Sequence, residues 1–152
     1  MSLKEKLQND LTDAMRARDE IRSSTIRMIL TSIKNEEVAG KEARELNDAG
    51  IITVLSREAK KRREAAEAFD QAGAKDRADQ ERAEGVVIGE YLPKQLTEDE
   101  IKSLIAAAMA ETGASTPAQM GLVMKSLQPK IAGKADGGLV SSLVKAALAG
   151  GN

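Results

Sequence analysis

The chain has 152 residues, with 23 Lys and Arg against 24 Asp and Glu, and its formal net charge is −1. It contains no Cys and no His, which excludes disulfide frameworks, Cys- or His-based metal sites, thiol nucleophiles and His general acid–base catalysis. Phe69 and Tyr91 are its two aromatic residues, too few for the stacking platform that many single-strand nucleic-acid binders use.

Four helices are predicted in the first 92 residues, each from a capping residue followed by apolar residues at helical spacing. The predicted N-cap residues are Ser2, Asp19, Asn47 and Asp76. The predicted helix ends are Ala17, Gly40, Gly73 and Leu92. The fourth helix is expected to end at Leu92 because Pro93 disfavours helical backbone at the residue before it.

Three shorter helices are predicted after Pro93. Their N-cap residues are Thr97, Thr116 and Asp136, and their expected ends are Gly113, the residue before Pro129, and Gly150. No segment shows the sustained period-two alternation of a β-strand. The sequence therefore predicts an all-α protein, with an N-terminal four-helix array and a small C-terminal three-helix domain.

The two halves differ in charge, and this difference supports a division into domains. Residues 1–92 carry a net charge of −2 and are rich in charged side chains, whereas residues 93–152 carry a net charge of +1 and fewer charges. We predict an N-terminal domain over residues 1–92, a linker over 93–96 and a C-terminal domain over 97–152.

A run of basic residues in the third predicted helix, residues 57–63, has two interpretations. It is typical of a nucleic-acid patch, but Glu58 with Arg62 and Lys60 with Glu64 are four residues apart and can form ion pairs along the helix. A self-paired, solvated face and a functional basic patch both remain open. Arg62 lies on the apolar stripe, so we expect it to extend to solvent or to pair with an acid of a neighbouring helix.

The clearest local excess of positive charge lies after residue 120. It consists of Lys125, Lys130, Lys134 and Lys145, and Asp136 is the one acid in this part of the sequence. These lysines are the candidate contacts to an anionic partner.

Several blocks of sequence, in order and over almost the whole chain, resemble the YqeY proteins of the GatB/YqeY family. The blocks are Arg27–Leu30, Ile33–Glu36, Lys61–Ala65, Glu90–Leu96, Met120–Met124 and Gly133–Val140. The resemblance implies a two-domain, all-helical protein. It also implies that the C-terminal domain is similar to the tail of the B subunit of glutamine-dependent tRNA amidotransferase, a tail that touches the tRNA body.

The resemblance and the lysines together lead to an expected function, a non-catalytic adaptor that binds tRNA or another structured RNA. The candidate RNA-binding residues are Lys125, Lys130, Lys134, Lys145, Gly133, Gly137 and Gly138. The glycines are included because their loop would let backbone N–H groups approach the sugar–phosphate chain at the start of the last helix. No residue is assigned a catalytic, cofactor-binding or metal-binding role.

Two other functions remain open. The chain is alternatively an accessory protein to a carbon–nitrogen ligase that uses glutamine as amido-N-donor, with an amidotransferase as its partner, as the resemblance implies. It is alternatively a helical protein–protein interaction module. The early polar residues Glu5 and Lys6, and the absence of an apolar run of about 18 residues, predict a cytoplasmic protein with no membrane partner.

Overall fold

The computed structural model describes residues 1–150, and its regular elements in this range are all helices, with no strand, which confirms the predicted all-α class. The helices are α1 (Leu3–Arg16), α2 (Glu20–Glu37), α3 (Asp48–Gln71), α4 (Lys75–Gly89), α5 (Glu98–Thr112), the single turn η1 (Pro117–Gln119), α6 (Met120–Ile131) and α7 (Gly137–Ala149). The chain forms two compact units, of which the first is Met1–Leu92 and the second begins at Pro93.

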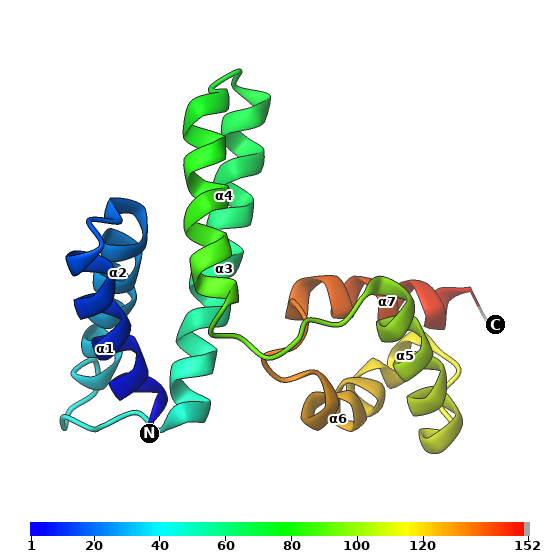
Figure 1. Ribbon diagram of the computed structural model, residues 1–152. Coiled ribbons are helices and arrows are strands. Elements are labelled where there is room, and N and C mark those ends of the chain that lie inside the picture. The colour runs from blue at the N-terminus through cyan, green and yellow to red at the C-terminus, as the bar shows by residue number, and fades with distance from the viewer. Residues whose placement is uncertain (151–152) are drawn as a thin grey trace. The chain divides into compact units, whose positions relative to one another are not determined.

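In the first unit, α3 and α4 form a long antiparallel hairpin that extends past the ends of α1 and α2 (Figure 1). The core lies where α1 and α2 meet the base of this hairpin. Its fully buried members include Leu7, Ile26, Ile29, Ile33, Ile51, Leu55 and Ile88. These residues recur at three- and four-residue spacing along their helices, so each helix buries one apolar stripe.

The second unit packs α5, α6 and α7 around a separate core. Its most buried members are Ile101, Ile105, Ala108, Val123, Leu127, Val140, Val144 and Leu148. Within the described part of this unit every buried residue is apolar. The stability of this unit therefore comes from apolar burial in a small core.

Five predicted N-caps are confirmed by their hydrogen bonds: the side chains of Ser2, Asp19, Asn47, Thr97 and Asp136 each accept a backbone N–H of the following turn. The predicted glycine ends of α3 and α5 are confirmed as well. Gly73 has φ +75° and Gly113 has φ +72°, the left-handed conformation that glycine adopts most readily after a helix.

The fourth predicted cap is wrong, because α4 begins one residue before Asp76. Ala74 is the N-cap and provides no side-chain hydrogen bond, while Asp76 lies in the first turn. The reason is the turn that precedes the helix: the Ala74 N–H donates to the Phe69 carbonyl at 2.8 Å, so α4 starts directly after the closure of α3. Asp76 still interacts favourably with the helix dipole there.

Three helix ends also differ from the prediction. α2 ends at Glu37, before Gly40, because the Glu37 carbonyl accepts the Arg44 N–H at 2.9 Å and the chain turns away. α6 continues through Pro129 to Ile131, since proline removes one helical hydrogen bond but burial of Ile131 in the core favours the extra turn. The fourth helix likewise ends at Gly89 and not at Leu92.

Candidate RNA-binding face

The four candidate lysines lie on the elements at the end of the second unit, and all four are exposed. Lys125 and Lys130 are on α6, Lys134 is in the loop after it, and Lys145 is on α7. The Lys130 Nζ lies 3.9 Å from the Glu111 carboxylate. The other three form no ion pair with any described residue.

The loop that carries Gly133 and Lys134 is tied to the segment before α5. The Lys134 carbonyl accepts the Leu96 N–H at 2.8 Å, and the Gly133 carbonyl accepts the Gln95 side-chain amide at 2.8 Å. Gly133 has φ +73°, which explains a glycine at this position. The segment 93–96, predicted as a linker, therefore has hydrogen bonds into the second unit, and the Lys134 backbone is held in place.

The start of α7 holds a carboxylate of the chain itself. The Asp136 side chain accepts the Gly138 N–H at 3.1 Å, so the N–H expected to approach a phosphate already has a partner. A side chain added at Gly137 would meet no heavy atom within 4 Å, so packing does not require glycine there. A phosphate at this helix end would have to displace Asp136, which makes the lysines the stronger candidates.

Acidic residues of the second unit gather at the start of α5, where Glu98, Asp99 and Glu100 occupy the first turn. There they interact favourably with the helix dipole. A hydrogen bond from the Thr97 backbone N–H, and then one with the Thr97 side chain, lower the pKa of Glu100. These acids have a role in starting α5, whereas three of the four candidate lysines have no ion-pair partner in the described chain.

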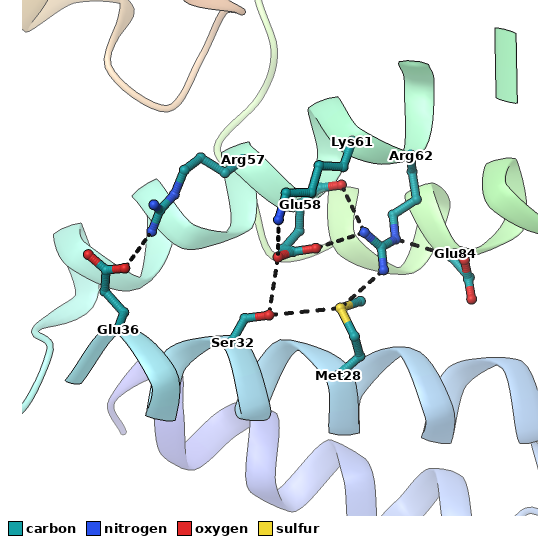
Figure 2. Close-up of polar contacts among 8 residues, drawn as sticks. All are labelled: Met28, Ser32, Glu36, Arg57, Glu58, Lys61, Arg62 and Glu84. Atoms are coloured by element: carbon teal, nitrogen blue, oxygen red, sulfur yellow. Dashed lines mark hydrogen bonds and ion pairs between the residues drawn. The ribbon is translucent and has the colours of Figure 1, made fainter. Parts of the chain in front are cut away.

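The basic run at 57–63 has a different environment, shown in Figure 2. Glu58 is 6% exposed, and its carboxylate lies 2.7 Å from Nη1 of Arg62 and accepts the Ser32 hydroxyl at 3.1 Å. The Arg62 Nε lies 3.8 Å from the Glu84 carboxylate of α4. The predicted pairing of Glu58 with Arg62, and of Arg62 with an acid of a neighbouring helix, is confirmed.

The same network uses other cations of this run. Arg57 lies 3.1 Å from Glu36 of α2, and Lys60 lies 4.0 Å from Glu64. Burial raises the pKa of Glu84, and repulsion from Glu81 acts in the same direction against the attraction of Arg62. The run therefore joins α2, α3 and α4 through charge pairs, which favours the self-paired interpretation.

One cluster that the sequence reasoning missed surrounds Tyr91. Its hydroxyl donates to Asp10 of α1 at 2.5 Å, and Arg22 of α2 lies 2.6 Å from the Glu90 carboxylate. Burial raises the pKa of the Tyr91 phenol, and the hydrogen bond to Asp10 raises it further. This cluster ties the end of α4 to α1 and α2, so the block Glu90–Leu96 has a structural role at its first residues. The sequence signal was limited to the fact that Tyr91 is the one tyrosine of the chain.

The second unit also contains an apolar groove of about 570 Å³ between α5 and α7. Its walls carry small side chains, including Ala106, Ala110 and Ala146, with Lys102 at its edge. None of the four candidate lysines lines it. Within residues 1–150 no group of acidic side chains is arranged to hold a metal ion, and no helix there is long and apolar enough to cross a membrane.

Comparison with known proteins gives the same family as the sequence blocks. A family model described as Yqey-like protein matches residues 4–148. The "Altered inheritance of mitochondria protein 41, mitochondrial" of Lachancea thermotolerans is 29% identical over 147 residues, covering 93% of this chain and 76% of the relative. The protein of the same name from Clavispora lusitaniae is 30% identical over 129 residues, covering 83% and 74%. A third, from Eremothecium gossypii, is 31% identical over 86 residues, covering 57% and 46%.

The names of these relatives contradict the expected cytoplasmic location, because all three are mitochondrial proteins by name. The comparison points to mitochondria instead. The expectation rested on a polar start and the absence of a long apolar run. Those features bear on secretion and membrane spans, and they do not distinguish the cytoplasm from an organelle.

Proposed function

The chain belongs to the YqeY-like family, and from this premise we propose that it is a non-catalytic adaptor that binds structured RNA through its second unit. The observation that carries the proposal is the set of exposed lysines Lys125, Lys134 and Lys145, which have no ion-pair partner in the described chain. Lysines that a fold does not use remain available for phosphate groups.

The proposed binding is electrostatic and therefore weak and dependent on salt. Each lysine that neutralises a phosphate releases condensed counterions, and the logarithm of the affinity falls by roughly 0.7–0.9 per decade of salt for each contact. The net charge of the chain is −1, so binding depends on the local excess of charge on α6, α7 and their connecting loop. We expect a shallow salt dependence that corresponds to three or four contacts.

We propose that a partner protein, and not this chain, carries out any amide transfer from glutamine. Amide transfer from glutamine needs a nucleophile that releases ammonia and a site that activates the acceptor carboxylate. The chain has no Cys and no His to supply the usual forms of these groups. We propose that any link to an amidotransferase is an accessory one, in which this protein holds the RNA.

The test is titration of a fluorescent tRNA with the protein at several salt concentrations. The variant Lys125→Ala/Lys134→Ala should reduce the salt slope by about two contacts, or roughly 1.4–1.8 in log–log units. Its helical content should remain that of the wild type, because both side chains are exposed. The matched control is Lys34→Ala/Lys75→Ala, two exposed lysines of the first unit. Equal tRNA affinity for the wild type and the first variant at every salt concentration contradicts the proposal.

A second function, a protein-interaction module, is favoured by the α5–α7 groove. Grooves of this kind accept the apolar face of a partner helix. The two functions separate experimentally, because Ala110→Glu places a charge in the groove and leaves the four lysines unchanged. Under the RNA proposal this variant retains its tRNA affinity.

A further inference from the structure

A hollow of about 730 Å³ lies on the first unit, where α1 turns into α2, and the function proposed above does not use it. Its lining includes Met15, Arg18, Glu20, Ile21, Arg27 and Gln80. The volume falls in the range of sites for small ligands. One concave surface is therefore bordered by two arginines, a carboxylate, an amide and two large apolar side chains.

Arg18 has a backbone conformation that elsewhere in the described chain is adopted by glycine alone. Its φ is +57°, and the other residues with positive φ in the described range are Gly73, Gly113 and Gly133. A left-handed conformation costs free energy for a residue with a Cβ atom, and glycine avoids this cost.

The end of α3 provides a direct comparison, because it has the same turn as the end of α1. After α1 the Arg18 N–H donates to the Met15 carbonyl and the next N–H donates to the Ala14 carbonyl. After α3 the Gly73 N–H and the next N–H make the equivalent bonds to Asp70 and Phe69. The turn itself therefore accepts glycine. No contact among the described residues gives the fold a reason for arginine at position 18.

The two arginines of the hollow also form no ion pair with any residue of the described range. Arg18 and Arg27 are exposed and pair with no described acid, whereas Arg22, between them in sequence, lies 2.6 Å from Glu90. Arginine binds phosphate well because its planar guanidinium group offers several N–H donors. The hollow thus carries two guanidinium groups available to an anion.

Apolar surface accompanies these charges. Met15 is 51% exposed and Ile21 is 45% exposed, and both border the hollow. Exposed side chains of this size beside free cations fit a ligand that has an anionic part and a flat, apolar part. A simple anion would leave Met15 and Ile21 unused.

We propose that this hollow binds a nucleotide, with the phosphate on Arg18 and Arg27 and the base against Met15 and Ile21. Bases in RNA complexes are held by packing on side chains and by hydrogen bonds at their edges. Glu20 and Gln80 provide the edge contacts, since a carboxylate accepts an amino N–H of a base and an amide both donates and accepts. The carboxylate of Glu20 repels phosphate, so the phosphate lies on the side of the arginines.

The experiment uses the full chain labelled with ¹⁵N and titrates it with adenosine, guanosine or cytidine 5′-monophosphate, inorganic phosphate, and a single-stranded RNA tetranucleotide. The expected result is a shift of amide signals at residues 15–27 with at least one nucleoside monophosphate, and none with inorganic phosphate at the same concentration. A tetranucleotide that binds more tightly than the monophosphate identifies RNA as the source of the nucleotide, and the reverse order identifies a free nucleotide.

Two variants and a control make the test specific. Arg27→Gln should weaken nucleotide binding by about tenfold or more, because it removes a charge-assisted contact. The control Lys34→Gln changes an exposed cation two turns further along the same helix and should leave binding unchanged. Arg18→Gly should raise the unfolding midpoint and weaken nucleotide binding, whereas a purely structural Arg18 would leave binding unchanged.

Three outcomes overturn the proposal. The first is the absence of any shift at residues 15–27 with every nucleotide. The second is an equal response to inorganic phosphate, which indicates an anion site without base recognition. The third is an equal effect of Arg27→Gln and Lys34→Gln. None of these outcomes bears on the lysines of the second unit, because the variants used here leave those lysines unchanged.

Discussion

The two units of this protein use charged side chains in opposite ways. The first unit buries Ser23, Thr25, Glu37 and Glu58 among its apolar residues, whereas the described part of the second unit buries apolar residues alone. Charges in the first unit are thus part of what joins its helices. Lysines of the second unit lie outside its core, which is why they are the better candidates for a partner.

The contrast shows how a run of basic residues in a helical sequence should be interpreted. Residues 57–63 have the highest density of positive charge in the chain, yet Arg62 pairs with a buried Glu58 and Arg57 pairs with Glu36. The four lysines of the second unit are spread over 21 positions of sequence and look less like a patch. The density of positive charge in a sequence is therefore a poorer guide to a nucleic-acid site than the number of acidic side chains that lie within ion-pair distance.

The largest expected effect concerns the apolar core of the second unit. Leu127 is fully buried, so Leu127→Ala should destabilise this unit by about 3–4 kcal/mol through lost burial and a cavity. Leu122→Ala on the same helix is the control, because Leu122 is 51% exposed and should change stability little. Urea denaturation with hydrogen exchange measures both. Equal loss of protection in the first unit would contradict two separate cores.

The next effect tests the buried charge pair of the first unit. Glu58→Ala leaves Arg62, whose side chain is 14% exposed, without its nearest acid, and should cost about 3 kcal/mol of unfolding free energy. Glu64→Ala removes an exposed partner of Lys60 and should cost about 0.5 kcal/mol or less. Urea denaturation of the two variants gives the comparison. Similar losses would mean that Glu58 contributes no more than a surface acid.

A smaller effect concerns the response of the first unit to acid. The Leu46 N–H, and then the Lys4 ammonium group, lower the pKa of Glu37 in the folded protein. Because the folded pKa of Glu37 lies below its unfolded value, the ionised carboxylate stabilises the folded protein at pH values above the unfolded pKa. This contribution is lost as the pH falls through the folded pKa. Glu37→Gln should therefore lose less stability than the wild type between about pH 6 and about pH 3. Parallel pH profiles would contradict this role.

The smallest effect compares two glycines of the α3–α4 hairpin. Gly89 has no positive φ and no heavy atom within 4 Å of an added Cβ, so Gly89→Ala should raise stability by about 0.5 kcal/mol. Gly73 has φ +75°, so Gly73→Ala should lower stability by about 1 kcal/mol. Thermal unfolding of both variants measures the difference. A loss of stability in both would show that Gly89 has a structural role outside its recorded contacts.

Most of the fold was predictable from the sequence because helix starts depend on local chemistry. Ser2 and Thr97 form capping boxes that any reader of the sequence can find, and both are present. The errors arose where tertiary contacts overrode local rules. Pro129 stays inside α6 because Ile131 packs in the core, and Asp76 loses its capping role to a turn that Phe69 and Ala74 close.

The candidate site was predictable only in part. The excess of lysine after residue 120 is visible in the sequence, and so is the pairing of Glu58 with Arg62. The carboxylate of Asp136 was predicted as the cap of α7, and the same carboxylate accepts the Gly138 N–H that was expected to approach a phosphate. The hydrogen bond between Tyr91 and Asp10 joins residues 81 positions apart, and no local pattern predicts such a contact.

The most direct test of the contrast between the units compares two matched triple variants in tRNA titrations at low and moderate salt. Lys125→Gln/Lys134→Gln/Lys145→Gln removes from the second unit three cations that pair with no described acid, and Arg57→Gln/Lys60→Gln/Lys61→Gln removes three paired cations from the first. We expect the first variant to lose most of its tRNA affinity and its salt slope to fall by roughly 2–3, and the second to bind as the wild type does. Equal losses in the two variants, or a loss in the second alone, would contradict the account.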